Sequence, residues 1–376
     1  MRKLMPAIRR VWNEDTRANP VLKAALIVIS KCYEALMRLR ADLYHKGFRA
    51  SKQLSCKVVS VGNITAGGTG KTPMTLYLAR SLAESGLRPA IVSRGYKGAL
   101  EAKGGVVSDG RKVLAGAADA GDEPFMMAKA LPNVPVIVGA DRYRAGRQAV
   151  SDFSPDVILL DDAFQHLKLK RDINLVLVDC SRPFGNGHVF PAGELREPLQ
   201  ALRRADAVIL TRTDFENPSG KVKSADERLI GRIQCPVFRT RHVPEVRRII
   251  RGGRSDTSNN TTGCNDEDII RGQRIFAFSG VAKNDYFLYM LAGLKGRVVG
   301  NQAFPDHHKY LPADLQTVCR RAKELKVDFL VTTEKDLVKI STDVNWPVAL
   351  IVMDIKISFG SDQKRFQSFL KQKLKL

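Results

Sequence analysis

The stretch at residues 57–73, KVVSVGNITAGGTGKTP, constrains the fold of this 376-residue chain more than any other. A short β-branched apolar run enters a glycine-rich turn, which reaches Lys71 and Thr72 and continues into a segment with helical character. A strand, a glycine-rich loop and a helix in this order are typical of a phosphate-binding loop, where backbone amides and the helix start face an anion. The lysine reaches terminal phosphates, and the threonine hydroxyl can ligate Mg²⁺. We therefore expect a nucleoside triphosphate ligand.

One position departs from the usual GxxxxGK[ST] pattern, because Thr65 stands where the pattern begins with glycine. A glycine-rich turn without a ligand is the alternative interpretation. The position of GK[ST] between a strand and a helix favours phosphate binding over that alternative. Pro73 agrees with a helix start here, since proline in the first helical turn gives up an amide that has no partner.

The composition limits the class of protein and the kinds of partner. A hydrophobic content of 44% with 27% charged residues is ordinary for a globular protein, and the length allows two domains. The net charge of +22 indicates an anionic partner, which charge alone leaves open among nucleic acid, an acidic membrane surface and phosphorylated substrates. Six cysteines without CxxC spacing argue against a zinc site and a disulfide framework.

The N-terminal segment, residues 1–56, is basic and contains an amphipathic helix over about residues 21–44. Its longest uncharged run, residues 24–30, is far shorter than the roughly 20 apolar residues that span a bilayer, so we expect no transmembrane helix. We also expect no secretory signal, because the start MRK is not followed by a long apolar run. The helix either lies in the interface of an anionic membrane or packs on the protein core.

Residues 57–236 alternate short apolar runs with segments of helical length, which is typical of a mostly parallel sheet covered on both faces. We therefore predict an α/β domain of the P-loop NTPase type, in which ligands gather at the carboxyl ends of the strands. The strands predicted after the first lie at residues 88–93, 134–138, 157–160, 174–178 and 207–210.

Acidic residues follow two of these segments. Asp161 and Asp162 come directly after a buried strand, as a Walker-B acid does that holds Mg²⁺ opposite the threonine hydroxyl, although paired acids can also simply form a turn. His166, four residues further on, would by itself be interpreted as structural. Asp122 in GDEP precedes a helix and can either accept a proton from a substrate hydroxyl or act as an N-cap. AVILTRTD resembles a GTPase base-reading element, but Arg212 replaces its lysine, and a strand-end turn is the simpler interpretation.

The second half begins with a composition shift. Residues 247–265 are rich in Arg, Gly, Ser, Asn and Thr, which indicates a loop or hairpin tip, and we expect residues 237–274 to form a linker or hairpin. Residues 275–376 are expected to form a second, smaller α/β domain, with strands at 275–279, 297–299, 328–332 and 348–353. Two polar clusters, PDHH and TTEKD, lie in it; a histidine beside an aspartate can tune a carboxylate across a cleft.

Taken together, these segments resemble the tetraacyldisaccharide 4'-kinases of the lipid A pathway over nearly the whole chain. The resemblance is carried by SVGNITAGGTGKTP, SRGYKG, GDEP, DDAFQH, PAGELREP, FPDHH and TTEKD, in that order. The family shares the Thr65-type departure. It implies ATP as the phosphoryl donor, with Mg²⁺, and an acylated disaccharide 1-phosphate lipid as the acceptor.

The resemblance also implies a role for individual residues. Asp122 is the candidate base toward the sugar 4'-hydroxyl, His307 pairs with it from the second domain, and Lys71 neutralises phosphate charge. Thr72 and Asp161 or Asp162 would hold Mg²⁺. The residues implied to bind ATP are Thr65, Ala66, Gly67, Gly68, Thr69, Gly70, Lys71, Thr72, Arg196 and Glu197. The residues implied to face the lipid substrate are Arg94, Tyr96 and Arg142.

The resemblance favours an interfacial helix, with the protein at the cytoplasmic face of the bacterial inner membrane. Ala163 replaces the glycine of the usual DDGFQH motif; it would be strained if that position needs a positive φ, and we expect the change to be tolerated. We expect a closed, dry cleft to raise the basicity of Asp122, and closure of the two halves to assemble the pair of Asp122 and His307.

Two other functions compete with the kinase. A P-loop GTPase-like regulator predicts guanine preference and nucleotide turnover without lipid. A nucleic-acid-binding ATPase would account for the charge, but the sequence contains no recognisable DNA- or RNA-binding module, so we expect no nucleic-acid partner.

Overall fold

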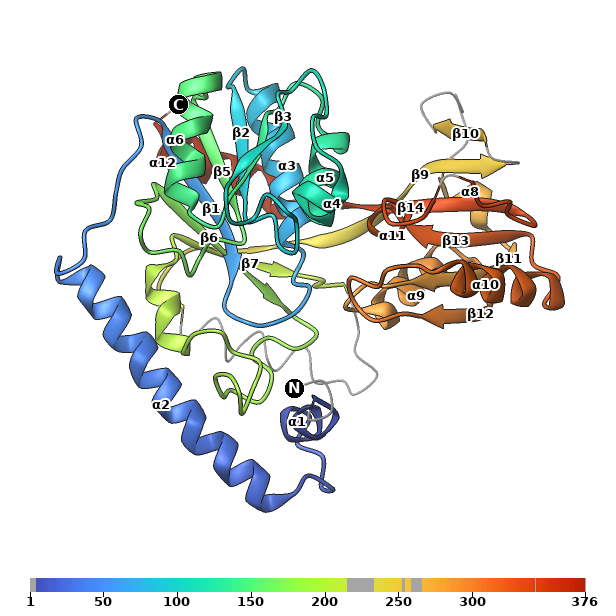
Figure 1. Cartoon of the computed structure of the whole chain (residues 1–376), viewed down its shortest axis with the longest axis horizontal. Helices are drawn as coiled ribbons and strands as arrows, with labels where there is room; N and C mark the ends of the chain where they lie inside the picture. The colour runs from blue at the N-terminus through green and yellow to red at the C-terminus, as the bar shows by residue number, and fades with distance from the viewer. Residues whose placement is uncertain (1–4, 215–232, 252–253, 258–265, 342, 376) are drawn as a thin grey trace.

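The computed structural model describes residues 5–214, 233–251, 254–257, 266–341 and 343–375. Within these residues two sheets form, one in each of two α/β domains, and a long helix near the N-terminus runs along the first domain (Figure 1). The expected mostly parallel sheet, the smaller second α/β unit and the N-terminal helix are confirmed.

The first sheet has eight strands and is parallel except for its edge strand β3, which pairs antiparallel with β4. In spatial order its strands are β3 (Gly105–Ser108), β4 (Val136–Val138), β2 (Pro89–Ser93), β5 (Val157–Asp161), β1 (Lys57–Asn63), β6 (Ile173–Asp179), β7 (Ala207–Thr211) and β8 (Val237–Arg239). Strands β5 and β6 near its centre are buried along their whole length, as the apolar runs predict for a sheet covered on both faces.

Alternate residues of the central strands enter two different cores. Val59 and Val61 of β1 pack with α3 (Lys71–Glu84) and α5 (Asp122–Ala130), whereas Val58 faces α6 (Arg142–Phe153). Two short helical segments complete the described part of this domain: α4 (Ala117–Ala120) and η1 (Leu199–Arg204). This two-sided cover leaves the carboxyl ends of the strands as the open edge of the sheet.

The second sheet has six strands in the order β10 (Arg254–Thr257), β9 (Arg241–Arg251), β14 (Ala349–Ser358), β13 (Phe329–Thr333), β11 (Arg274–Ser279) and β12 (Arg297–Ala303). Its helices are α8 (Asp266–Ile270), α9 (Asn284–Gly293), α10 (Pro312–Glu324) and α11 (Glu334–Leu337). Strand β9 pairs antiparallel with both neighbours, and the other pairs are parallel.

The expected domain boundaries need two corrections. Residues 237–274 are not a separate linker, because β8 completes the first sheet and β9 begins the second. Strands β9 and β10 do pair as a hairpin within the expected segment 247–265, of which residues 252–253 and 258–265 lie outside the described part of the chain. The composition shift therefore marks a hairpin at the edge of the second sheet.

The second correction concerns the C-terminal helix α12 (Gln363–Leu374), which follows the short turn η3 (Gly360–Asp362). Its residues Phe366, Phe369 and Leu370 are buried in the core of the first domain, together with α3 and β8. The chain thus crosses from the first domain to the second between β8 and β9, and returns after β14. The second domain is an insertion within the first.

The N-terminal helices α1 (Met5–Trp12) and α2 (Pro20–His45) lie against the first domain. Asn19 caps α2 by accepting hydrogen bonds from two amides, and Pro20 occupies the first turn, which explains why the helix begins there. One face is anchored, since Ser30 donates to the carbonyl of Val189 and Tyr33 to that of Arg196.

The opposite face of α2 is apolar and exposed. Val21, Val28, Leu36 and Leu39 lie on it and are each more than half exposed. We call these four residues the α2 stripe. No helix in the described residues is long and apolar enough to cross a bilayer.

Candidate active site

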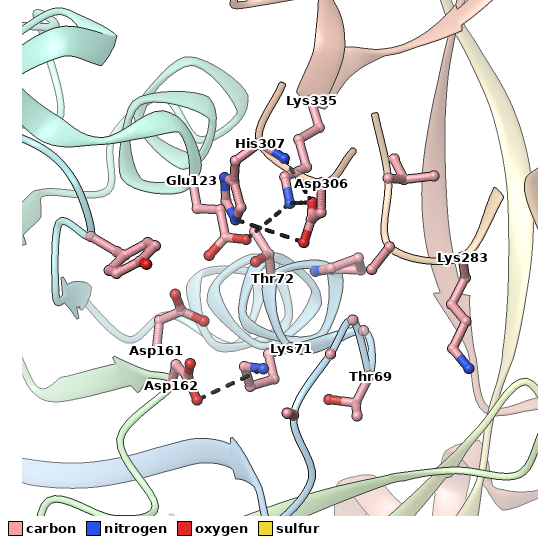
Figure 2. A pocket seen from close by; sticks show the side chains of 18 of the residues that line it. Thr69, Lys71, Thr72, Glu123, Asp161, Asp162, Lys283, Asp306, His307 and Lys335 are labelled. Atoms are coloured by element: carbon pink, nitrogen blue, oxygen red, sulfur yellow. Dashed lines mark hydrogen bonds and ion pairs between the residues drawn. The ribbon is translucent and has the colours of Figure 1, made fainter. Parts of the chain in front are cut away.

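A cavity of about 1000 Å³ lies between the two domains. Its walls are the glycine-rich loop before α3, the ends of β2 and β5, the start of α5 and, from the second domain, the segments around His307 and Lys335. Figure 2 shows Lys71, Thr72, Asp161 and Asp162 on one side of this space, with Lys335 and His307 above them. The residues singled out in widely separated motifs therefore meet in one place.

The glycine-rich loop has the conformation that the phosphate-binding interpretation requires. Gly67 and Gly70 adopt φ values of +114° and +88°, which an L side chain disfavours, and Gly70 caps α3. The Asn63 amide donates to the hydroxyl of Thr69 at 2.9 Å and fixes the loop on β1. Ala66 through Thr72 line the cavity. Thr65 does not line it; it is buried and bridges to Leu195.

A second contact to this loop involves Arg212, for which the sequence predicted only a strand-end turn. It has a φ of +57°, donates to the Gly68 carbonyl at 2.8 Å and pairs with Asp179 at 2.5 Å. Its guanidinium also lies over the ring of Tyr286 from the second domain. Arg212 thus stabilises the glycine-rich loop through its hydrogen bond to the Gly68 carbonyl. These contacts give no support to the interpretation of AVILTRTD as a GTPase base-reading element.

Asp161 ends strand β5 and is buried beneath the loop helix. Its oxygens accept hydrogen bonds from the hydroxyls of Thr75 and Ser93, each at 3.2 Å. Burial, reinforced by the negative charges of Glu123 and Asp162, raises the pKa of Asp161 to about 7. Within the described residues no lysine or arginine forms an ion pair with Asp161, and the residue lines the cavity.

Asp162 occupies a left-handed turn, with a φ of +48°. It pairs with Arg196 at 2.8 Å and with Lys71 at 3.7 Å. Burial works against its ionisation, but Lys71 and Arg196 outweigh burial and lower its pKa. Ala163, the next residue, is buried and is not among the described residues with positive φ, so its side chain causes no backbone strain and the expected tolerance is supported.

The oxygen donors here fit a hard cation such as Mg²⁺. Thr72 stands at the helix start and lines the same cavity as both carboxylates (Figure 2). In the described chain no cluster of three or more His, Cys, Asp or Glu residues is arranged to hold a metal alone. Mg²⁺ is usually bound through one or two carboxylates together with substrate phosphates and water, so this donor set suits it.

Asp122 and His307 meet across the domain interface. The His307 Nδ1 and the Asp122 Oδ2 are 3.2 Å apart, although 185 residues separate them in sequence. Asp122 is the first residue of α5, whose N-cap is Gly121, so its side chain is free of the capping role that the sequence left open. Tyr96 meets the imidazole edge-on, with the ring centroids 6.1 Å apart.

The expected rise in the basicity of Asp122 is wrong. The hydrogen bond with His307 lowers the pKa of Asp122, and the charges of Lys339 and Lys335 act in the same direction, so together they outweigh partial burial. Asp122 is therefore an ionised acceptor at neutral pH.

The remaining predicted residues divide into those inside and outside the cavity. Arg94, Tyr96, Arg142 and Arg196 line it. Arg142 is buried, donates to the carbonyls of Gly139 and Ala140, and has its pKa lowered by burial. Glu197 is not in the cavity wall, which corrects its expected place at the nucleotide; the buried carboxylate pairs with Arg204 instead.

Sequence reasoning missed several residues of the cavity wall. Glu123, Asp306 and Lys335 form an ion-pair network above the loop, and each lies directly beside a residue or motif that was singled out. The signal was present in GDEP, FPDHH and TTEKD, where the charged neighbours of the chosen residues were not considered. Lys283 and His242 were also missed, since neither lies in a motif.

This fold and cavity define a P-loop nucleoside triphosphate-binding protein whose second domain covers the phosphate loop. Comparison with known proteins identifies the family. The chain belongs to the tetraacyldisaccharide-1-P 4'-kinase family, whose profile matches residues 22–375.

The similarity to individual relatives extends over the full length. The chain is 41% identical to a tetraacyldisaccharide 4'-kinase of Desulfatibacillum aliphaticivorans, covering 99% of this chain and 100% of the relative. It is 39% identical to that of Syntrophus aciditrophicus, covering 98% of each. Among solved structures it is similar to LpxK from Aquifex aeolicus in complex with ATP, with 31% identity, a TM-score of 0.70, and coverage of 94% of this chain and 99% of that one.

Proposed function

We propose that this protein transfers the γ-phosphoryl group of ATP to the 4'-hydroxyl of a tetraacyldisaccharide 1-phosphate, a lipid A precursor. One observation carries the proposal. The pair of Asp122 and His307, drawn from two domains, lies in the same cavity as a complete phosphate-binding loop. A proton acceptor beside a triphosphate site is what phosphoryl transfer to an alcohol requires.

The chain positions the reactants and neutralises charge. The amides of the loop and the start of α3 face the phosphates, and Lys71 neutralises the charge that develops on the transferred group. Thr72, Asp161 and Asp162 would hold Mg²⁺, which would neutralise and polarise the phosphates when bound. Arg196, held on Asp162 at 2.8 Å, keeps that carboxylate turned toward Lys71.

Asp122 acts as the proton acceptor of the sugar hydroxyl, and His307 holds its carboxylate in place. A lowered pKa suits this role, because the carboxylate is ionised at neutral pH. In a loose transition state the bond between the attacking oxygen and the phosphorus is only slightly formed. A weak base in the right place therefore suffices to take the proton.

The lipid substrate reaches this cavity from the side of α2. Arg94, Tyr96 and Arg142 line the wall near Asp122 and suit a phosphate or sugar hydroxyls. The exposed α2 stripe on a basic N-terminal segment suits the anionic cytoplasmic face of the bacterial inner membrane, where an acylated substrate resides.

The test is a direct assay of transfer. Purified protein is incubated with Mg-ATP and the acylated disaccharide 1-phosphate, with and without detergent micelles, and we expect a product heavier by one phosphate. Asp122→Ala and His307→Ala should each lower turnover at least 100-fold. Turnover near wild type in both variants would refute the assigned mechanism. Lipid-independent hydrolysis with preference for GTP would instead favour the nucleotide-switch alternative.

A further inference from the structure

Lys335 forms ion pairs with residues of both domains above the phosphate loop. It lies on the short helix α11 of the second domain, and its side chain is 20% exposed. Its Nζ is 3.0 Å from the Asp306 Oδ1 and 3.4 Å from the Glu123 Oε1 (Figure 2). Asp306 belongs to the second domain and Glu123 to the first, so one ammonium group bridges the interface.

The other charged residues of the TTEKD motif pair within the second domain. Glu334 pairs with Arg248 of β9, and Asp336 pairs with Lys339 at 3.0 Å. Lys335 is therefore the charged residue of this motif whose ion pair reaches the first domain. These two ion pairs hold α11 in place on the second domain, so the backbone that carries Lys335 is fixed.

The two partners of Lys335 are the chain neighbours of the catalytic pair. Glu123 follows Asp122 in the first turn of α5, and Asp306 precedes His307 in the loop after β12. Without the ammonium group, two carboxylates would face each other across the interface with no cation between them. Their repulsion would act on the segments that hold Asp122 and His307 at 3.2 Å.

We propose that Lys335 is a positioning residue that holds Glu123 and Asp306 together and thereby keeps Asp122 and His307 in contact when the two domains enclose ATP and the lipid. This inference rests on the function proposed above. Lys335 acts through the pair; it does not itself take the proton.

The charges around Asp122 give the inference a measurable pH signature. The groups that face Asp122 are Glu123 on its own helix, Asp306 and His307 on the loop after β12, and Lys335 and Lys339 from α11 and the turn after it. Both lysines lower the pKa of Asp122. Removing one cation should raise that pKa, so activity on the acid side should be lost at a higher pH than in the wild type.

The experiment compares Lys335→Met and Lys335→Arg with the wild type in the lipid-phosphorylation assay. We expect the methionine variant to lose about 30-fold in kcat, because a displacement of about 1 Å in a reacting pair costs up to about 100-fold. Its KM for Mg-ATP should change less than about threefold, since the phosphate loop is untouched. The arginine variant should keep at least a third of kcat, because it preserves the charge.

Lys356→Met is the matched control. Lys356 pairs with Glu245 between β14 and β9, outside the cavity wall, so its loss should leave kcat and the pH profile unchanged. If Lys335→Met does not fold, Lys335→Gln replaces it in the same assay.

A double variant separates positioning from an independent effect. If Lys335 acts through the pair, Lys335→Met added to His307→Ala should lower the rate by less than about threefold beyond His307→Ala alone. The inference would be overturned if the double variant lost rate by the product of the two single-variant factors. It would also be overturned if Lys335→Met alone kept more than half of the wild-type kcat. An inactive wild type would instead refute the proposed function, and the inference that rests on it would fall with it, so the two failures are distinguishable.

Discussion

Replacing Phe366 by alanine tests whether the C-terminal helix belongs to the first domain. The ring is fully buried and stacks on Phe359, with the centroids 4.1 Å apart and the planes 13° apart. It also meets Phe238 of β8 edge-on at 5.1 Å, and Tyr77 of α3 at 6.4 Å. These partners lie on α3, on β8 and in the segment that follows β14, so the phenyl ring packs the C-terminal helix against the first domain.

The size of the effect follows from this packing. A buried Phe→Ala change costs about 3–5 kcal/mol through lost transfer energy and the remaining cavity. Each aromatic pair adds about 0.5–1.5 kcal/mol to the packing. We therefore expect Phe366→Ala to lower the free energy of unfolding by about 4 kcal/mol, a large part of the roughly 5–15 kcal/mol that stabilises a typical protein. The corresponding fall in Tm is about 10 °C.

The part of the protein that loses stability shows whether α12 belongs to the first or to the second domain. Hydrogen exchange read by mass spectrometry should show faster exchange in α3 and β8 of the variant, while β11 and β13 of the second domain keep their wild-type rates. Urea unfolding measures the total loss. Phe48→Ala serves as the control, because Phe48 is 77% exposed and its removal should leave stability within about 0.5 kcal/mol.

Faster exchange confined to the second domain, with α3 unchanged, would refute the assignment. So would a loss of less than about 1 kcal/mol in urea, because a buried, stacked phenyl ring cannot be removed at that cost if the packing is as described.

Two further predictions concern the metal site and the membrane surface. In metal-free protein the folded state keeps the proton of Asp161 up to about pH 7, whereas the unfolded chain releases it near its ordinary value, so this group destabilises the fold progressively as pH rises from about 4 to about 7. Asp161→Asn should therefore gain Tm relative to the wild type between pH 5 and pH 8 without Mg²⁺; parallel pH dependences would contradict this. Leu36→Glu, in the α2 stripe, should lower cosedimentation with anionic vesicles severalfold. Ala83→Glu adds the same charge at an exposed position on α3 and should leave cosedimentation unchanged. An equal loss of cosedimentation in both variants would assign vesicle binding to net charge alone.

Local patterns predicted the first domain well because its strands are buried on both faces. The run at β5 and the alternation of Val58 and Val59 between two cores follow directly from that burial. The loop before α3 was predicted in detail, since a turn that presents its amides to an anion needs glycine where φ is positive, as at Gly70. Local chemistry there determines local structure.

The domain boundaries were harder to predict because they depend on pairing partners. Nothing in the sequence of β8 indicates that it joins the first sheet while β9, after Thr240 alone, joins the second. Helix α12 has an ordinary amphipathic pattern that does not say which core receives Phe366.

All the predicted site residues except Thr65 and Glu197 line one cavity, but the electrostatics of that cavity were predicted less well. The pairing of Asp122 with His307 came from the family resemblance, and the structure brings the two side chains together. The direction of the Asp122 pKa shift was predicted wrongly, because the hydrogen bond with His307 and the charges of Lys339 and Lys335 together outweigh burial, and the two lysines had not been considered. Glu197 was assigned to the nucleotide through the family resemblance, but its carboxylate pairs with Arg204, whereas the neighbouring Arg196 pairs with Asp162 in the cavity.

The return of α12 to the first domain has a consequence for biosynthesis. Domains generally fold as units in the order in which they leave the ribosome. Here α3 and β8 are synthesised before the inserted domain, whereas α12, which shares their core, is synthesised after it. The inserted domain is therefore complete before that core can close, and a chain that stops before α12 would contain every motif of the site but lack the helix that closes the core beneath them.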